Sequence, residues 1–107
     1  MKNLISLFLT LFTVLSVYGQ SGTVTGRILD ESKLPLSGAY IYLDGIQGNS
    51  TDINGYYTFV DVPVGSHELT VSFIGYEESK ATIDVMDGQT TVQNFNLEPG
   101  VSLQEIV

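Results

Sequence analysis

Apolar and polar residues alternate with a period of two along most of the chain after residue 20, as in strands that bury one face of a sheet. Turn-forming pairs such as Asp44-Gly45 and Asp87-Gly88 interrupt the alternation about every 8–12 residues. The same part of the sequence has no helical periodicity. The pattern therefore predicts an all-β fold, a β-sandwich of seven strands. The inward positions expected from the alternation are Val24, Gly26, Ile28, Ala39, Ile41, Leu43, Tyr57, Phe59, Leu69, Val71, Phe73, Ala81, Ile83, Val85, Phe95 and Leu97.

Two of the predicted strands are less regular than the others. In the last run, Phe95 and Leu97 share a face, but Val92 is out of phase with them. One extra residue in a strand reverses the phase, so we expect a β-bulge near Gln93. Residues 48–51 are short and polar, and we expect them to form the seventh strand.

The first residues have the pattern of an export signal. Lys2 supplies a positive charge, and residues 4–17 are apolar except for Ser and Thr. A secretory signal has an apolar region of about 7–15 residues, whereas a membrane helix needs about 20. Gly19 is a small residue at the expected cleavage point, so Gln20 would begin the mature chain. We predict a signal-peptide helix over residues 1–19; a short buried helix or an uncleaved anchor is the alternative.

The composition disfavours several classes of function. The 107 residues include 4 Lys and Arg against 12 Asp and Glu, a formal charge of −8, which disfavours nucleic acid as a partner. There is no cysteine for a disulfide, a thiolate nucleophile or a zinc site, and one histidine, His67, is too few for a histidine-rich metal site. We predict a single small noncatalytic module without metal or cofactor.

Three polar motifs suggest chemistry, but each has a simpler interpretation. Residues 52–55 (DING) resemble part of a calcium loop but lack its third acidic ligand and distal Glu, so we expect an Asx turn. His67 follows Ser66, yet no G-x-S-x-G elbow occurs, and we expect a solvent-exposed or edge histidine. Glu77 and Glu78 are adjacent, and on a strand they would point to opposite faces. No catalytic residue is predicted.

Two surfaces remain as candidate binding sites. Tyr40 and Tyr42 share the face opposite Ile41, where they either pack across strands, the interpretation we favour, or form a platform for carbohydrate. Pro99-Gly100 is typical of the start of a linker that leaves the sandwich. Beyond it, residues 101–107 alternate apolar and polar positions. This tail is an extra edge strand, a frayed end, or a peptide that the sheet edge of another protein captures.

Five segments carry a resemblance to a known family. In order, they are residues 22–28 (GTVTGRI), 35–39 (PLSGA), 51–57 (TDINGYY), 62–65 (VPVG) and 69–77 (LTVSFIGYE). Together they resemble the carboxypeptidase regulatory-like domain over about residues 22–97. This resemblance implies a seven-stranded β-sandwich of the transthyretin-like or Ig-like kind. It implies no zinc ligands, since the domain is the accessory part of carboxypeptidases.

With its leader and its tail, the arrangement resembles the N-terminus of a TonB-dependent outer-membrane receptor of the SusC type. In that family the sandwich lies in the periplasm and precedes a TonB box, a plug and a barrel. The sequence is truncated before any plug or barrel, so we expect a fragment, a truncated product or a free-standing module. The domains expected are a signal peptide (1–19), a sandwich (20–98) and a linker with a TonB-box-like tail (99–107).

The resemblance also implies a role for the tail. Leu103, Gln104, Glu105, Ile106 and Val107 occupy the TonB-box position, and the implied partner is a TonB-type energy-transducing protein. If the chain is a fragment, the rest of a receptor for nutrient or glycan uptake is a second partner. The expected location is the periplasm, in association with the outer membrane. The alternative function is a secreted module that binds carbohydrate or protein through the two tyrosines named above.

Overall fold

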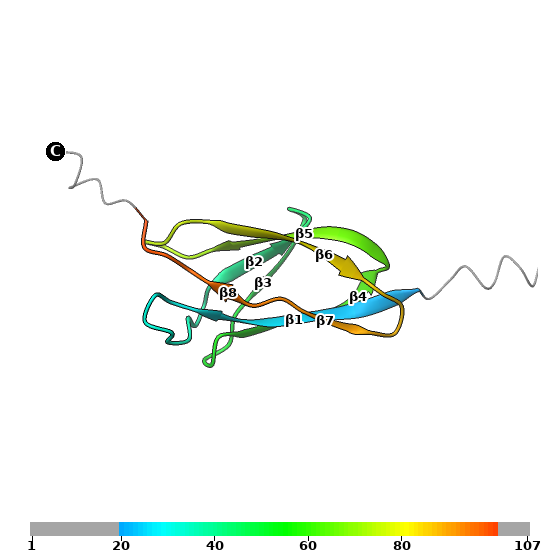
Figure 1. Cartoon of the computed structure of the whole chain (residues 1–107), viewed down its shortest axis with the longest axis horizontal. Helices are drawn as coiled ribbons and strands as arrows, with labels where there is room; N and C mark the ends of the chain where they lie inside the picture. Colours follow the sequence, from blue (N-terminus) through cyan, green and yellow to red (C-terminus); the bar gives the residue numbers. More distant parts are fainter. Residues whose placement is uncertain (1–19, 101–107) are drawn as a thin grey trace, which may run out of the picture.

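A computed structural model describes residues 20–100, and all of its regular structure is β-strand (Figure 1). The leader and the tail predicted from sequence lie outside the described residues. Within the described range no helix is long and apolar enough to cross a membrane. The strands are β1 (Ser21–Leu29), β2 (Tyr40–Leu43), β3 (Gln47–Ser50), β4 (Tyr56–Pro63), β5 (Gly65–Ser72), β6 (Ser79–Val85), β7 (Thr90–Val92) and β8 (Phe95–Asn96).

The strands form two sheets that face each other (Figure 1). One sheet has the order β4-β1-β7, with β8 also paired to β1, and the other has the order β3-β2-β5-β6. Each sheet has a buried face and a solvent face, so the predicted two-sheet all-β fold is confirmed. The predicted strands are all present, and the last of them is divided into β7 and β8.

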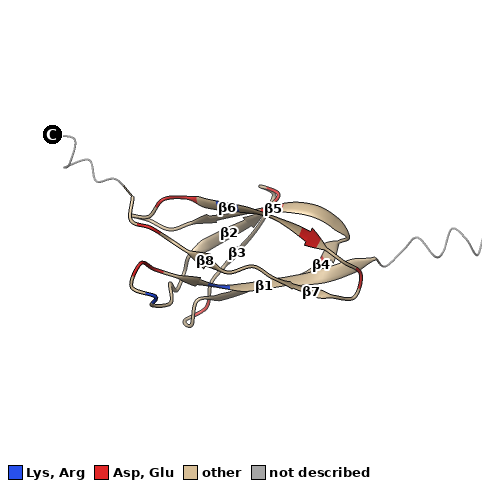
Figure 2. Cartoon of the chain, viewed as in Figure 1, with Lys and Arg blue, Asp and Glu red and all other residues tan. Residues whose placement is uncertain are grey.

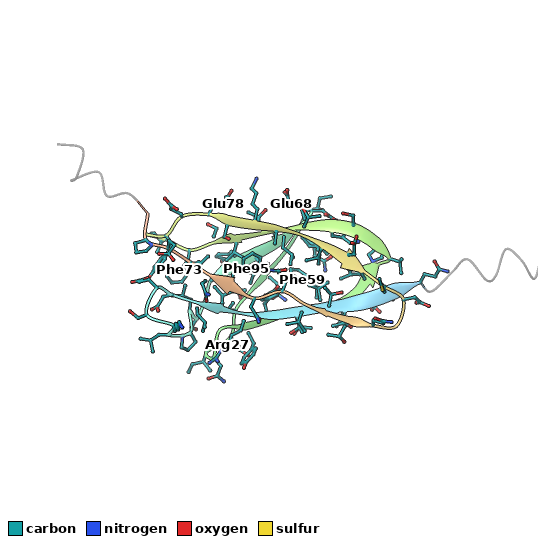
Figure 3. All side chains as sticks on the ribbon, viewed as in Figure 1. Arg27, Phe59, Glu68, Phe73, Glu78 and Phe95 are labelled. Atoms are coloured by element: carbon teal, nitrogen blue, oxygen red, sulfur yellow. The ribbon has the colours of Figure 1, made fainter. Side chains whose placement is uncertain are left out.

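The alternation in the sequence places the core correctly. Along β1 each even-numbered residue from Gly22 to Ile28 is buried, and Phe59 and Phe95 project between the sheets (Figure 3). Phe73 and Ala81 are partial exceptions, because both are only partly buried, and Phe73 lies one residue beyond the end of β5. Leu36 and Val62 are buried although the alternation did not mark them as inward. The buried apolar side chains are Val24, Ile28, Leu36, Ala39, Ile41, Leu43, Tyr57, Phe59, Val62, Leu69, Val71, Ile83, Val85, Phe95 and Leu97.

The bulge expected near Gln93 is absent. Thr25 pairs with Val92 and Ile28 pairs with Phe95, so the same number of residues separates the two pairs on each strand. Phe95 keeps its inward phase, and Val92 simply faces solvent. The prediction was wrong because it assumed that every valine in a strand is buried.

A bulge occurs in β4 instead. Between the pairs that Gly22 and Val24 form with Val62 and Phe59, β4 has one residue more than β1. Val60 is exposed, and Asp61, the next residue, has a φ of 55°. The extra residue lets both flanking apolar side chains of β4 enter the core.

Gly26 allows the last part of the chain to cross β1 at very short range. A Cβ atom built at this position would lie 1.8 Å from the Gln93 carbonyl oxygen. That carbonyl turns out of the ladder and accepts a hydrogen bond from the Tyr57 hydroxyl at 2.6 Å. The Arg27 amide donates instead to Oδ1 of Asn94 at 2.9 Å. The break between β7 and β8 is therefore satisfied by side chains, as a buried polar backbone requires.

The parallel pairing of β8 with β1 fixes where the chain enters and leaves the sandwich. Since the first and last strands run in the same direction, the start of β1 and the end of the described chain lie at opposite ends of the body (Figure 1). The described chain leaves the body at Pro99 and Gly100, a point called the exit below. A short antiparallel bridge between Tyr76 and Pro99 holds it in place. The Glu77 amide donates to the Glu98 carbonyl, and the Gly100 amide donates to the Gly75 carbonyl, each at 2.9 Å.

Candidate functional site

The tail residues Leu103, Gln104, Glu105, Ile106 and Val107, predicted to bind a partner, lie outside the described residues. Their point of departure is nevertheless well defined, because backbone hydrogen bonds attach the chain to the body as far as Gly100. The sandwich therefore presents whatever follows Gly100 at one end of its long axis (Figure 1).

The exit end of the body is mostly acidic, although Lys33 lies in the same loop as Glu31 and Lys80 contacts Glu78. Acidic residues from three separate segments, at the end of β1, before β6 and after β8, surround the bridge that holds the exit (Figure 2). Desolvation and the nearby Glu31 carboxylate raise the pKa of Tyr76, which is a member of that bridge. Two large apolar side chains, Leu34 and Ile74, are exposed in the loops of the same region. The acidic residues are Asp30, Glu31, Glu77, Glu78 and Glu98.

Tyr40 and Tyr42 lie on the outer face of the β3-β2-β5-β6 sheet, as the alternation predicted. Their ring centroids are 6.3 Å apart and their planes differ by 17°, so they form a stacked pair along β2. Tyr40 is 57% exposed and Tyr42 is 38% exposed. The pair is a small aromatic strip that is accessible to solvent.

The cross-strand neighbours of the tyrosine pair are small. Tyr42 is opposite Gly48 on β3, where an added Cβ would lie 3.4 Å from the tyrosine ring. On the other side, Ser72 pairs with Tyr40 and Thr70 pairs with Tyr42. The ring of Tyr42 covers a glycine of the edge strand, which supports the packing role; Tyr40 keeps more than half of its surface free.

The DING segment is an Asx turn, as predicted. Oδ1 of Asp52 accepts hydrogen bonds from the Asn54 amide at 2.9 Å and from the Tyr56 amide at 3.0 Å. Gly55 has a φ of 82°, and its carbonyl accepts a hydrogen bond from the Ile28 amide. The Asp52 carboxylate thus shapes the turn that leads into β4. Within residues 20–100, no group of three or more His, Cys, Asp or Glu side chains is arranged to hold a metal.

His67 differs from the sequence prediction. Its side chain is 12% exposed and lies on β5, an inner strand, so the solvent-exposed or edge position expected for it was wrong. Nδ1 lies 2.6 Å from Oδ2 of Asp44, and Nε2 lies 2.6 Å from the Pro63 carbonyl oxygen. The other carboxylate oxygen of Asp44 accepts a hydrogen bond from the Glu68 amide at 2.9 Å. Neither nitrogen of the ring contacts a serine hydroxyl, so this is no catalytic triad.

The two side chains change each other's protonation. The hydrogen bond to Asp44 raises the pKa of His67, and the bond to His67, with that from the Glu68 amide, lowers the pKa of Asp44. The sequence pattern does not predict this pair, because 23 residues separate its members. Only the pairing of β2 with β5 brings them together, and the Asp-Gly turn signal alone gives no sign of it.

Glu77 and Glu78 do not form a catalytic pair of carboxylates. They lie in the connection before β6 rather than on a strand, and both are exposed. Glu78 has a 4.0 Å contact with Lys80, and its side chain points away from the sandwich (Figure 3). An exposed pair at this distance contributes little to stability.

Comparison with known proteins identifies the class of domain. The chain matches the CarboxypepD_reg-like domain family over residues 24–107, so it belongs to that family. It is also 36% identical over 81 residues to TonB-dependent receptor P39 of Formosa agariphila, a match that covers 75% of this chain. The chain spans 8% of the length of that receptor.

Similar sandwiches occur in solved structures. The Bacillus anthracis TIE protein aligns with a TM-score of 0.66 and 24% identity, covering 75% of this chain and 17% of that protein. GBS52, the minor pilin of Streptococcus agalactiae, aligns with a TM-score of 0.65 and 14% identity, covering 78% of this chain and 46% of the pilin. Identities this low establish a shared sandwich fold and nothing more.

Proposed function

We propose that this chain is the noncatalytic periplasmic domain at the N-terminus of a TonB-dependent outer-membrane receptor. In this proposal residues 1–19 direct export, the body over residues 20–98 is a transthyretin-like spacer, and residues 99–107 form the linker and the tail. The tail, Leu103 to Val107, binds a TonB-type energy-transducing protein. The observation that supports the proposal most strongly is the 36% sequence identity, over 81 residues, to a TonB-dependent receptor.

The geometry of the exit supports this assignment. The hydrogen bonds of the Tyr76–Pro99 bridge end at Gly100, one residue before the alternating segment begins. An extended segment that leaves a rigid body at one end is accessible to a partner that adds it to a sheet edge. The acidic groups around the exit favour a partner whose contacting surface is basic or neutral.

The tail's role is tested by direct binding. We expect the chain to bind the periplasmic domain of the TonB-type protein of the same organism, and deletion of residues 101–107 to abolish this binding. The reason is that an extended peptide added to a sheet edge gains affinity from its backbone hydrogen bonds and specificity from pockets for its alternate side chains. Isothermal titration calorimetry measures the affinity of both forms.

Two controls separate recognition of the tail from unfolding. A variant with the order of residues 101–107 scrambled should lose affinity while its thermal melting curve stays unchanged. The double variant Tyr40→Ala, Tyr42→Ala keeps the tail and should bind like the natural chain. Undiminished binding after deletion of the tail would contradict the proposal.

The second candidate function is a secreted module that binds carbohydrate or protein, and the exposure of the stacked Tyr40–Tyr42 strip favours it. Aromatic faces at a regular spacing along a strand offer two stacking positions to one extended ligand. The two tyrosines also pack over the sheet, so they contribute to its stability as well.

A glycan array distinguishes the two functions. If the strip is the site, the double variant Tyr40→Ala, Tyr42→Ala should lose binding to any retained glycan by more than about tenfold, since each lost stacking contact costs roughly 1 kcal/mol. Deletion of residues 101–107 should leave that binding unchanged. Equal retention by the natural chain and the double variant would eliminate the tyrosine strip as a glycan site.

A further inference from the structure

The contacts of His67 require a particular proton count. A neutral imidazole has one donor nitrogen and one acceptor nitrogen, whereas the imidazolium has two donors. Both partners of this ring, Oδ2 of Asp44 and the Pro63 carbonyl oxygen, are acceptors at 2.6 Å. Only the doubly protonated ring makes both hydrogen bonds. The loss of one proton leaves two acceptors facing each other at one end of the ring.

The two contacts join separate parts of the chain. Asp44 begins the turn between β2 and β3, and Pro63 ends β4 just before the turn into β5. Asp44 has a φ of 54°, in the left-handed region that few non-glycine residues adopt but in which Asp is enriched. Its carboxylate is held by His67 on one oxygen and by the Glu68 amide on the other.

We propose that the imidazolium of His67 is a proton-dependent clamp that fastens the turn after β2 to the end of β4. While the ring is protonated the clamp is closed and both turns are held. When the ring loses a proton, the remaining proton stays on the nitrogen facing the Asp44 carboxylate, the stronger acceptor. The hydrogen bond to Pro63 is then lost, and the bond to Asp44 is weakened because the ring no longer carries a charge.

Asp44 is the acidic group that favours the protonated ring of His67. Asp44 faces it directly from the turn after β2. Glu68, the next residue on β5, points outward (Figure 3). Asp84 on β6 and Asp61 on β4 are exposed.

The direction of the pH effect follows from these shifts. The pKa of folded His67 is raised above its ordinary value of 6.5, so its contribution to stability is complete below that value. The contribution is lost as pH rises through the folded pKa, because the folded state alone still holds the proton in that interval. There the folding equilibrium constant falls by up to about tenfold per pH unit. Asp44, whose pKa is lowered from 3.8, loses its contribution only in stronger acid.

NMR titration of the full chain tests the clamp. The sequence contains one histidine, so the ring signals of a ¹⁵N-labelled sample belong to His67 without further assignment. We expect both ring nitrogens to be protonated at pH 6 and the titration midpoint to lie above 6.5. Amide exchange at Glu68 should accelerate above that midpoint by more than the intrinsic effect of hydroxide, because the bond that holds its acceptor, Asp44, to the ring is then weakened.

Two variants show which carboxylate controls the titration of His67. Asp44→Asn should lower the midpoint and abolish the extra exchange at Glu68, whereas Asp84→Asn, an exposed carboxylate on β6, should leave the midpoint where it is. A midpoint at or below 6.5, or the same decrease in both variants, would overturn the clamp. If Asp44→Asn does not fold, the midpoint and the Glu68 exchange of the natural chain still decide the question.

Discussion

Replacement of Gly26 by alanine is expected to destabilise the sandwich by about 3 kcal/mol or more, at the upper end of the usual cost of overpacking. The new Cβ would lie 1.8 Å from the Gln93 carbonyl oxygen, and this neighbour is backbone that cannot rotate away. Its displacement would also break the hydrogen bond from the Tyr57 hydroxyl. A domain of this size has a total stability of only about 4–12 kcal/mol, so a loss of about 3 kcal/mol removes roughly a quarter to three quarters of that stability.

Urea denaturation followed by circular dichroism measures the loss, and Gly48→Ala is the matched control. Gly48 also lies within a strand, but a Cβ there would meet only the Tyr42 ring, at 3.4 Å. The control should therefore lie within about 1 kcal/mol of the natural chain. Similar midpoints for the two variants would show that the chain does not cross β1 at Gly26 as described.

Truncation of Leu69 to alanine is expected to cost about 2–5 kcal/mol. Leu69 is fully buried on β5, where it pairs with Leu43 on one side and Ala81 on the other. Removing its side chain leaves a cavity that neighbouring strands cannot fill, because their positions are fixed by the ladder on both sides. Val71, the next inward residue of the strand, is equally buried and smaller, so its truncation should cost less.

Thr70→Ala is the control for this register. Thr70 lies between the two buried residues and faces outward beside Tyr42, so its change should cost less than about 1 kcal/mol. Thermal and urea unfolding of the three variants would rank them Leu69, Val71, Thr70. An equal cost for Thr70 and Leu69 would mean that β5 is shifted by one residue, since such a shift exchanges the two faces.

The sequence predicts those features of the fold that depend on residues close to one another in the chain. Burial of one face gives each strand its period of two, so the inward positions of β1, β2 and β5 follow directly from the pattern. The turn at Asp52 is also local, because its carboxylate bonds amides two and four residues away. Phase errors arose where an apolar residue is exposed, as at Val92.

The candidate site also has features that the sequence predicts and features that depend on tertiary contacts. The outward position of Tyr40 and Tyr42 follows from alternation alone, whereas their stacking and partial exposure depend on the strands at each side. The role of His67 was missed for a physical reason, since its partners come from two turns that meet only when the strands pair. A sequence specifies which side chains are available to donate and accept; it does not specify which of them meet.

The sequence by itself determined the class of fold, the core positions, the turn at Asp52 and the resemblance to the carboxypeptidase regulatory-like family, because these depend on periodicity and on short motifs. Tertiary structure alone decided that β8 runs parallel to β1, which places the two ends of the body far apart. It also decided the crossing at Gly26 and the closure of the His67 clamp. Each of these depends on contacts between residues distant in sequence, whose positions are set only when both sheets are complete.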